Sequence, residues 1–159
     1  MPDSSQIKEN YDRVASVYDI VDWLIPDRWR IRALQFARGR VLEVGVGSGL
    51  NLPIYTSACS EVLGIDVSPG MLHKAARKVR HARIPVFLYE MDVQSLAFPD
   101  ASFDTVLATC VFCTVPEPAL GLREMRRVCK PTGTIILVEH VRSKQGWLGQ
   151  VMDFFNPVT

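Results

Sequence analysis

Val41-Leu42-Glu43-Val44-Gly45-Val46-Gly47-Ser48-Gly49-Leu50 is the stretch that decides the fold of this 159-residue chain. Its apolar first half is typical of a buried strand, and three glycines at alternate positions follow. A carboxylate, Glu43, comes two residues before the first of these glycines. Glycine accepts positive φ and lets the backbone come close to a ligand, and the amide groups of a following helix start face whatever is bound there. The stretch therefore predicts a strand that ends in a ligand-binding loop.

Apolar runs alternate with helical patterns through the rest of the chain. Several of the runs are nearly continuous, which indicates a parallel sheet that is buried on both faces. The alternation predicts an α/β fold with a doubly wound, mostly parallel sheet between two layers of helices. We expect strands at residues 40–44, 61–65, 86–89, 103–109 and 134–139, a turn at 131–133, and helices at 4–18, from Pro26 onward, and at 50–56, 69–79, 117–129 and 143–155.

The composition is that of an ordinary globular domain, with 48% hydrophobic residues and a net charge of +1. A charge so close to zero gives no general attraction to nucleic acid. No apolar run reaches the roughly 20 residues that a membrane span needs, and the N-terminus lacks the pattern of a signal peptide. The four cysteines have no disulfide-framework spacing, and Cys110-x-x-Cys113 has no second ligand pair for a metal. We therefore expect one cytoplasmic domain without a metal or a nucleic-acid partner.

Acidic residues stand at or just beyond the ends of the first three predicted strands, namely Glu43, Asp66 and Asp92. Ligands of open α/β sheets bind beyond the carboxyl ends of the strands, so this layout predicts an adenosine across these three strands. Leu50 occupies the position where a dinucleotide fingerprint needs its third small residue, and no P-loop lysine follows the glycines. A loop without phosphate-binding features and with a leading acid favours a cofactor that carries a cation, such as S-adenosylmethionine.

Three motifs carry a family resemblance: Glu43–Gly49, the run Gly64-Ile65-Asp66-Val67-Ser68-Pro69-Gly70-Met71, and the turn Lys130-Pro131-Thr132-Gly133. Over roughly residues 11–142 the chain resembles class I S-adenosylmethionine-dependent methyltransferases of the ubiquinone/menaquinone-biosynthesis type. Within that family, LEVGVGSGLNLPIY and TVPEPALGLREMRRVCKP look most like bacterial phosphatidylethanolamine N-methyltransferases and related small-molecule methyltransferases. The resemblance implies a Rossmann-like fold that uses S-adenosylmethionine and releases S-adenosylhomocysteine.

The resemblance also implies roles for individual residues. Glu43 would organise the ammonium of the cofactor and Asp66 its ribose, while the end of the strand 103–109 would lie beside the reactive methyl. An N-terminal lid over residues 1–38 would close on a cofactor-binding core at 39–142, and 143–159 would form a C-terminal helix. The cofactor-binding residues implied are Tyr11, Tyr18, Glu43, Gly45, Gly47, Gly49, Asp66, Val67, Met71, Asp92, Val93, Thr109 and Cys110, and the candidate general bases are Tyr18, Asp19 and His140.

The family sheet has two further strands after the strand 134–139. We therefore expect either that the chain is truncated or that a second copy in a homo-oligomer covers this edge. A phospholipid amine is the acceptor that the resemblance favours, with a quinone precursor or a small thiol as alternatives. The basic run Lys74–Arg83 is either a solvated helix face or a patch for anionic lipid at the inner face of a membrane. A nicotinamide-dependent oxidoreductase and a non-catalytic cofactor-binding module stay open as other classes.

Overall fold

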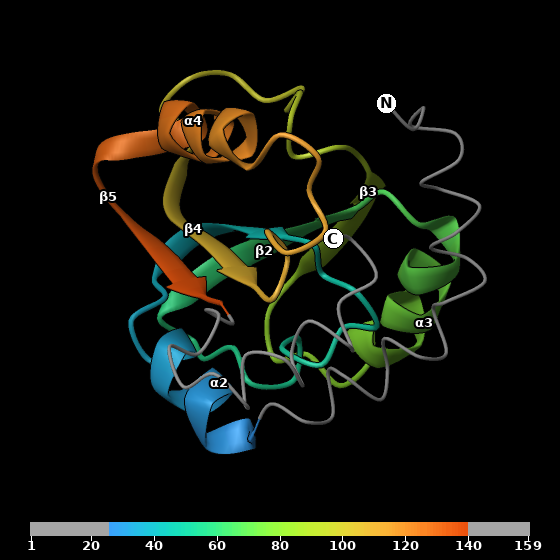
Figure 1. Ribbon diagram of the computed structural model, residues 1–159. Coiled ribbons are helices and arrows are strands. Elements are labelled where there is room, and N and C mark those ends of the chain that lie inside the picture. The colour runs from blue at the N-terminus through green and yellow to red at the C-terminus, as the bar shows by residue number, and fades with distance from the viewer. Residues whose placement is uncertain (1–25, 140–159) are drawn as a thin grey trace, which may run out of the picture.

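The computed structural model describes residues 26–139, which form a five-stranded parallel sheet with helices on both faces (Figure 1). The strand order is β3-β2-β1-β4-β5, so the strand that carries the glycine loop is central. In chain order the elements are α2 (Asp27–Leu34), β1 (Gly39–Val44), β2 (Cys59–Asp66), α3 (Pro69–Val79), β3 (Val86–Glu90), β4 (Phe103–Thr109), α4 (Pro118–Val128) and β5 (Cys129–Val138).

The register of β1 brings the functional ends of three strands together. Val44, the last residue of β1, lies opposite Ile65 of β2 and Ala108 of β4. Because the strands are parallel, their carboxyl ends meet at one edge of the sheet. The reversal of strand order between β1 and β4 creates the switch point at which ligands of such sheets bind. The predicted Rossmann-like arrangement is confirmed for the described residues.

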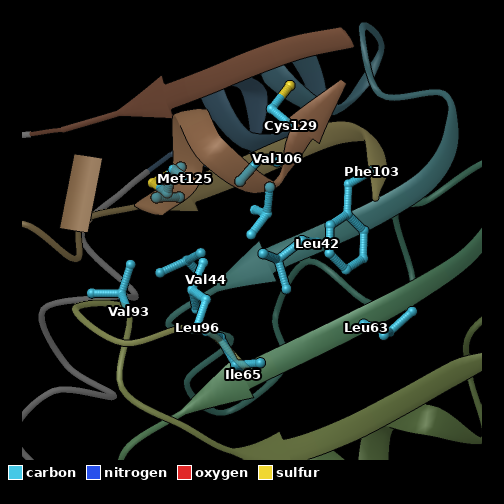
Figure 2. Packing of buried hydrophobic residues seen from close by; sticks show 12 residues of the cluster. Leu42, Val44, Leu63, Ile65, Val93, Leu96, Phe103, Val106, Met125 and Cys129 are labelled. Atoms are coloured by element: carbon cyan, nitrogen blue, oxygen red, sulfur yellow. The ribbon is translucent and has the colours of Figure 1, made fainter. Parts of the chain in front are cut away.

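Two apolar clusters hold the layers on the sheet. On one face, Met125 and Val128 of α4 pack with side chains of β1, β2 and β4, most of which Figure 2 shows from close by. On the other face, Leu34 of α2 and Ala75 of α3 pack with Val41 and Val62 of the same sheet. Both clusters contain residues of β1, which explains why apolar residues on both of its faces follow one another, interrupted only by Glu43.

The connection between β3 and β4 is fastened to α4 by one guanidinium. Arg127 donates to both carboxylate oxygens of Glu124, at 2.7 and 2.8 Å, and to Asp100 at 2.7 Å. It also donates to the carbonyl oxygens of Leu96 and Phe98. Arg127 therefore fixes the path of the chain that follows Asp92.

Two local predictions were wrong. Residues 50–56 do not form a helix but a series of turns, in which Leu52 N donates to Gly49 O and Ile54 N to Asn51 O. The predicted turn at 131–133 lies within β5, at an irregularity in its pairing with β4. Phe103 pairs with Cys129, but Thr105, two residues later in β4, pairs with Thr134, five residues later in β5. The other predicted strands and helices between residues 40 and 139 are present, with ends shifted by up to two residues, except that β5 begins at Cys129, five residues before its predicted start.

The described sheet ends at β3 on one side and at β5 on the other. The predicted helices 4–18 and 143–155, and the candidate residues Tyr11, Tyr18, Asp19 and His140, lie outside the described residues. Within 26–139, no helix combines the length and the hydropathy that crossing a bilayer requires.

Candidate functional site

All three glycines of the loop after β1 have positive φ: +61° at Gly45, +55° at Gly47 and +80° at Gly49. This is the left-handed region that side chains with a Cβ rarely adopt. A Cβ on Gly45 would lie 2.5 Å from Cγ2 of Val111, and one on Gly49 would lie 3.0 Å from the backbone of Ala75. The glycines therefore let the loop turn tightly although Val111 lies against Gly45 and Ala75 lies against Gly49.

Asp66, at the end of β2, joins this loop to the start of α3. Its Oδ2 accepts a hydrogen bond from Gly47 N at 2.9 Å, and its Oδ1 accepts one from Ser68 N at 2.9 Å. Ser68 in turn caps α3, because its hydroxyl accepts from Met71 N at 3.2 Å. Asp66, the acid that we expect to bind the ribose, is thus held by backbone amides of the glycine loop and of the start of α3.

Glu43, the acid that precedes the glycines, is 1% exposed and accepts from two side chains. Asn51 Nδ2 donates to its Oε1 at 2.8 Å, and the Tyr55 hydroxyl donates to its Oε2 at 2.9 Å. A buried carboxylate needs such donors because it has lost its water. Burial, and next the charge of Glu43, raise the pKa of Tyr55 well above its usual value, so Tyr55 stays a donor at neutral pH.

Asn51 is the centre of this network. Its amide nitrogen also lies 3.2 Å from Oγ1 of Thr109, and its Oδ1 accepts from Nη1 of Arg30 at 3.1 Å. The guanidinium of Arg30 thereby fixes which end of the amide faces Glu43. Arg30 comes from α2 and is 2% exposed, so the helix before β1 is tied to the glycine loop through a buried polar contact.

The end of β4 forms the third side of the site. Thr109 is buried and belongs to the Asn51 network, while Cys110 has φ +54°. Cys110 N donates to Val138 O at 2.7 Å. The Glu139 carboxylate, just past β5, accepts from the next two amides of the chain, Val111 N and Phe112 N. The turn that follows β4 is therefore held from the neighbouring strand.

The residues predicted to flank the adenine surround the ends of β2 and β3. Asp92 accepts from Gln94 N at 2.8 Å and from Gln94 Nε2, and so orders the turn after β3. Val93 and Met71 are each 5% exposed, and the side chain of Val93 belongs to the core under α4. Any adenine contact of Val93 would therefore involve its backbone. Val67 is half-buried between Asp66 and the cap of α3.

The structure brings together the predicted site residues between Glu43 and Cys110 along the carboxyl edge of the sheet. Sequence reasoning missed Arg30, Asn51, Tyr55 and Glu139. Asn51 and Tyr55 carried one signal, a polar residue and a tyrosine placed within a short apolar stretch directly after the glycines. Within residues 26–139, no cluster of three His, Cys, Asp or Glu side chains could hold a metal ion.

Comparisons with known proteins agree on one family description. A methyltransferase domain profile matches residues 42–137. A phosphatidylethanolamine N-methyltransferase of Cereibacter sphaeroides is 42% identical over 150 residues, which are 91% of this chain and 73% of that protein. The thiol S-methyltransferase TMT1B of Homo sapiens is 33% identical over 134 residues, 80% of this chain and 54% of that protein.

Among solved structures, the 4+2 cyclase SpnF superposes with a TM-score of 0.78 at 26% identity. That superposition covers 91% of this chain and 63% of SpnF. The chain thus spans between about half and three quarters of the length of these three proteins.

Proposed function

The chain belongs to the methyltransferase domain family, whose cofactor is S-adenosylmethionine, and on that premise we propose that it methylates a phospholipid amine of the phosphatidylethanolamine type. The observation that supports this choice of methyl acceptor is the 42% identity to a phosphatidylethanolamine N-methyltransferase over 91% of this chain. A quinone precursor and a small thiol remain the alternatives, the latter because of the similarity to a thiol S-methyltransferase.

The geometry of the glycine loop supports the cofactor part of this proposal. Three glycines at positive φ would let the loop come close to a ligand, and the carboxylate of Glu43 is buried beside it. A cofactor that carries an ammonium and a sulfonium suits this charge. Asp66 would accept from the ribose hydroxyls, since each of its carboxylate oxygens has a second lone pair beside the one that an amide uses.

Bound S-adenosylmethionine would supply an electrophilic methyl group on a positively charged sulfur. The residues of this chain then have to position the acceptor in line and exclude water. Thr109 and Cys110 stand at the end of β4, where the acceptor would meet the methyl. An amine acceptor must lose a proton before it attacks, and we keep Tyr18 and His140 as candidates for the group that takes it. We propose residues 1–38 as the lid, 39–142 as the core and 143–159 as a C-terminal helix.

The test uses the full chain with S-adenosylmethionine that is isotopically labelled on its methyl group. Three acceptors are offered in parallel: vesicles that contain phosphatidylethanolamine, a quinone precursor and a small thiol. We expect label in the lipid fraction as N-methylated phosphatidylethanolamine. Transfer to either of the other acceptors alone would replace the proposed substrate. Cofactor binding without any transfer would favour a non-catalytic module, and binding of a nicotinamide cofactor in its place would favour an oxidoreductase.

Contact with a membrane would bring such a substrate within reach, and the α3 face is the surface that we propose for it. Residues 69–83 contain no acidic side chain, and Arg77, Arg80 and Arg83 are exposed. Each cation near an anionic leaflet contributes about 1 kcal/mol of attraction, which suits a cytoplasmic protein that contacts the inner membrane face. Sedimentation with phosphatidylserine vesicles should exceed that with neutral vesicles, and Arg80→Glu with Arg83→Glu should remove the difference.

A homo-oligomer would cover the edge of β5, where the side chain of Leu137 is 46% exposed. Sedimentation velocity of the full chain measures this directly. A single species with the mass of one chain would contradict the oligomer.

A further inference from the structure

Cys110 holds the backbone in a conformation that costs energy. Its φ of +54° places a residue with a Cβ in the left-handed region, which favours glycine. The position is the first after β4, at the edge of the sheet where the cofactor is proposed to bind. Such a conformation persists only when the surrounding contacts impose it. The contacts that impose it here come from the end of β5.

The Glu139 carboxylate supplies most of these contacts. A single oxygen, Oε1, accepts from Val111 N at 3.0 Å and from Phe112 N at 3.3 Å. Cys110 N donates to the carbonyl oxygen of Val138, the residue before Glu139. Three consecutive amides after β4 are thus bound by two consecutive residues at the end of β5.

The turn held in this way presses on the glycine loop. Val111 packs so closely over Gly45 that an added Cβ there would meet its Cγ2 at 2.5 Å. On its other side, Cε1 of Phe112 lies 2.9 Å from where a Cβ of Gly121 in α4 would be. The turn lies between the loop and α4, so a displacement of the turn would change the contact of Val111 with Gly45.

We propose that Glu139 is a positioning residue for the cofactor: through the amides of Val111 and Phe112 it seats the 110–112 turn on Gly45 and so sets the affinity for S-adenosylmethionine. This inference rests on the proposed function, because it needs that cofactor in the glycine loop. Glu139 acts through the turn and need not touch the cofactor itself. Its acceptor oxygen, and not its charge, is the feature that the role requires.

The two substitutions that separate these features are Glu139→Gln and Glu139→Ala. Glutamine keeps an Oε1 that can accept from both amides, whereas alanine leaves them without it. Apparent affinity falls by the fraction of molecules that lose the binding-competent arrangement. We therefore expect Glu139→Ala to weaken S-adenosylmethionine binding about tenfold or more, and Glu139→Gln to weaken it by less than about threefold. Glu117→Ala, an exposed carboxylate at the start of α4, is the matched control and should bind like the wild type.

Isothermal titration of the full chain with S-adenosylmethionine measures these affinities, at a temperature well below the unfolding midpoint of each variant. Amide hydrogen exchange adds a readout that a general loss of stability does not imitate. In Glu139→Ala, exchange should accelerate at Val111 and Phe112 and stay unchanged in the middle of α4. If Glu139→Ala does not fold, Val111→Ala tests the same step, because it removes the contact over Gly45 and should weaken binding about threefold or more.

Three results would overturn the inference. Affinity within about twofold of the wild type in folded Glu139→Ala would show a merely structural role. Equal weakening by Glu139→Gln and Glu139→Ala would show that charge, and not the turn, is what matters. A wild-type chain that does not bind S-adenosylmethionine would refute the proposed function and the inference with it, whereas the first two results would leave the proposed function intact.

Discussion

Replacing Tyr55 by phenylalanine would remove one hydroxyl from the buried carboxylate at the end of β1. The hydroxyl donates to Oε2 of Glu43 at 2.9 Å, and the Tyr55 and Glu43 residues are each 1% exposed. No bulk water can therefore replace the lost donor without entering the core. The ring itself would keep its packing, because phenylalanine differs from tyrosine only by this group.

The expected loss of stability follows from the charge of the acceptor. A hydrogen bond to an ionised group contributes about 1.5–3 kcal/mol, and a buried partner left without it bears the cost of its own desolvation. Part of this loss is offset, because the phenol no longer has to be buried. We expect Tyr55→Phe to lower the free energy of unfolding by about 2 kcal/mol.

Urea denaturation followed by fluorescence measures this loss as a lower midpoint with an unchanged m-value. Tyr89→Phe is the matched control, because Tyr89 is 43% exposed at the edge of β3 and contacts the ring of Phe98. That control should stay within about 0.5 kcal/mol of the wild type. A loss for Tyr55→Phe equally small would refute the conclusion that the hydroxyl supports the carboxylate.

The same pair predicts an alkaline effect. Burial and Glu43 raise the pKa of Tyr55 above its ordinary value, so the folded protein holds the phenolic proton more tightly than the unfolded chain. The resulting stability is complete below about pH 10, the value for a free tyrosine, and is lost as the pH rises toward the folded pKa. Tyr55→Phe should remove this contribution, and unfolding curves at increasing pH would measure it.

Three further predictions concern the backbone and the charged contacts. Gly45→Ala should cost about 2–4 kcal/mol, because alanine would be strained at φ +61° and would clash with Val111; a urea midpoint like that of the wild type would contradict this. Arg127→Ala should cost about 1–3 kcal/mol, measured by thermal unfolding, since it removes donors from two backbone carbonyls in a partly exposed position; Arg126→Ala, at an exposed position, is its control. Hydrogen bonds from Lys130 and from the Arg40 amide hold the pKa of Asp104 below its usual value. The stability that this gives is present above about pH 4 and is lost as the pH falls through the folded pKa; Asp104→Asn should flatten the acid branch of a stability–pH curve.

The fold could be predicted because its strands are local patterns with one physical cause. β1 and β4 are buried on both faces, and their apolar runs report this directly. The acids at the strand ends were found for a similar reason: a parallel sheet brings its carboxyl ends to one edge. The family prediction is confirmed by the matching domain and by relatives that cover most of this chain.

The buried network could not be predicted, because its members converge only in three dimensions. Arg30 lies 21 residues from Asn51, and Thr109 lies 58 residues from it. Arg30 looks like an ordinary surface side chain in the sequence, and nothing there pairs Asn51 with Thr109, although Thr109 was itself expected at the site. Arg30 meets Asn51 because α2 packs in the same cluster as the turns that follow the glycine loop, which no local pattern encodes.

The wrong helix at 50–56 has the same origin. Its apolar residues suit a helix, but Pro53 has no N–H to donate, and Asn51 and Tyr55 both turn toward Glu43. Turns with i→i+3 bonds satisfy the local amides of Leu52 and Ile54 while they leave these side chains directed at the carboxylate. The contacts of one buried charge therefore outweighed the helical propensity of a short segment.

The two acids of the site are supported in different ways, and the difference bears on what each can bind. Asp66 is held by backbone amides of the loop and of α3, so its position follows the backbone. Glu43 is held by the side-chain amide of Asn51 and the hydroxyl of Tyr55, so its position follows the packing of those side chains. A carboxylate buried beside a glycine loop attracts a cation, whereas an acid that organises two backbone segments is suited to accept from hydroxyl groups. The pair thus favours a ligand with a positive charge near β1 and a diol near β2, which is the order of groups in S-adenosylmethionine.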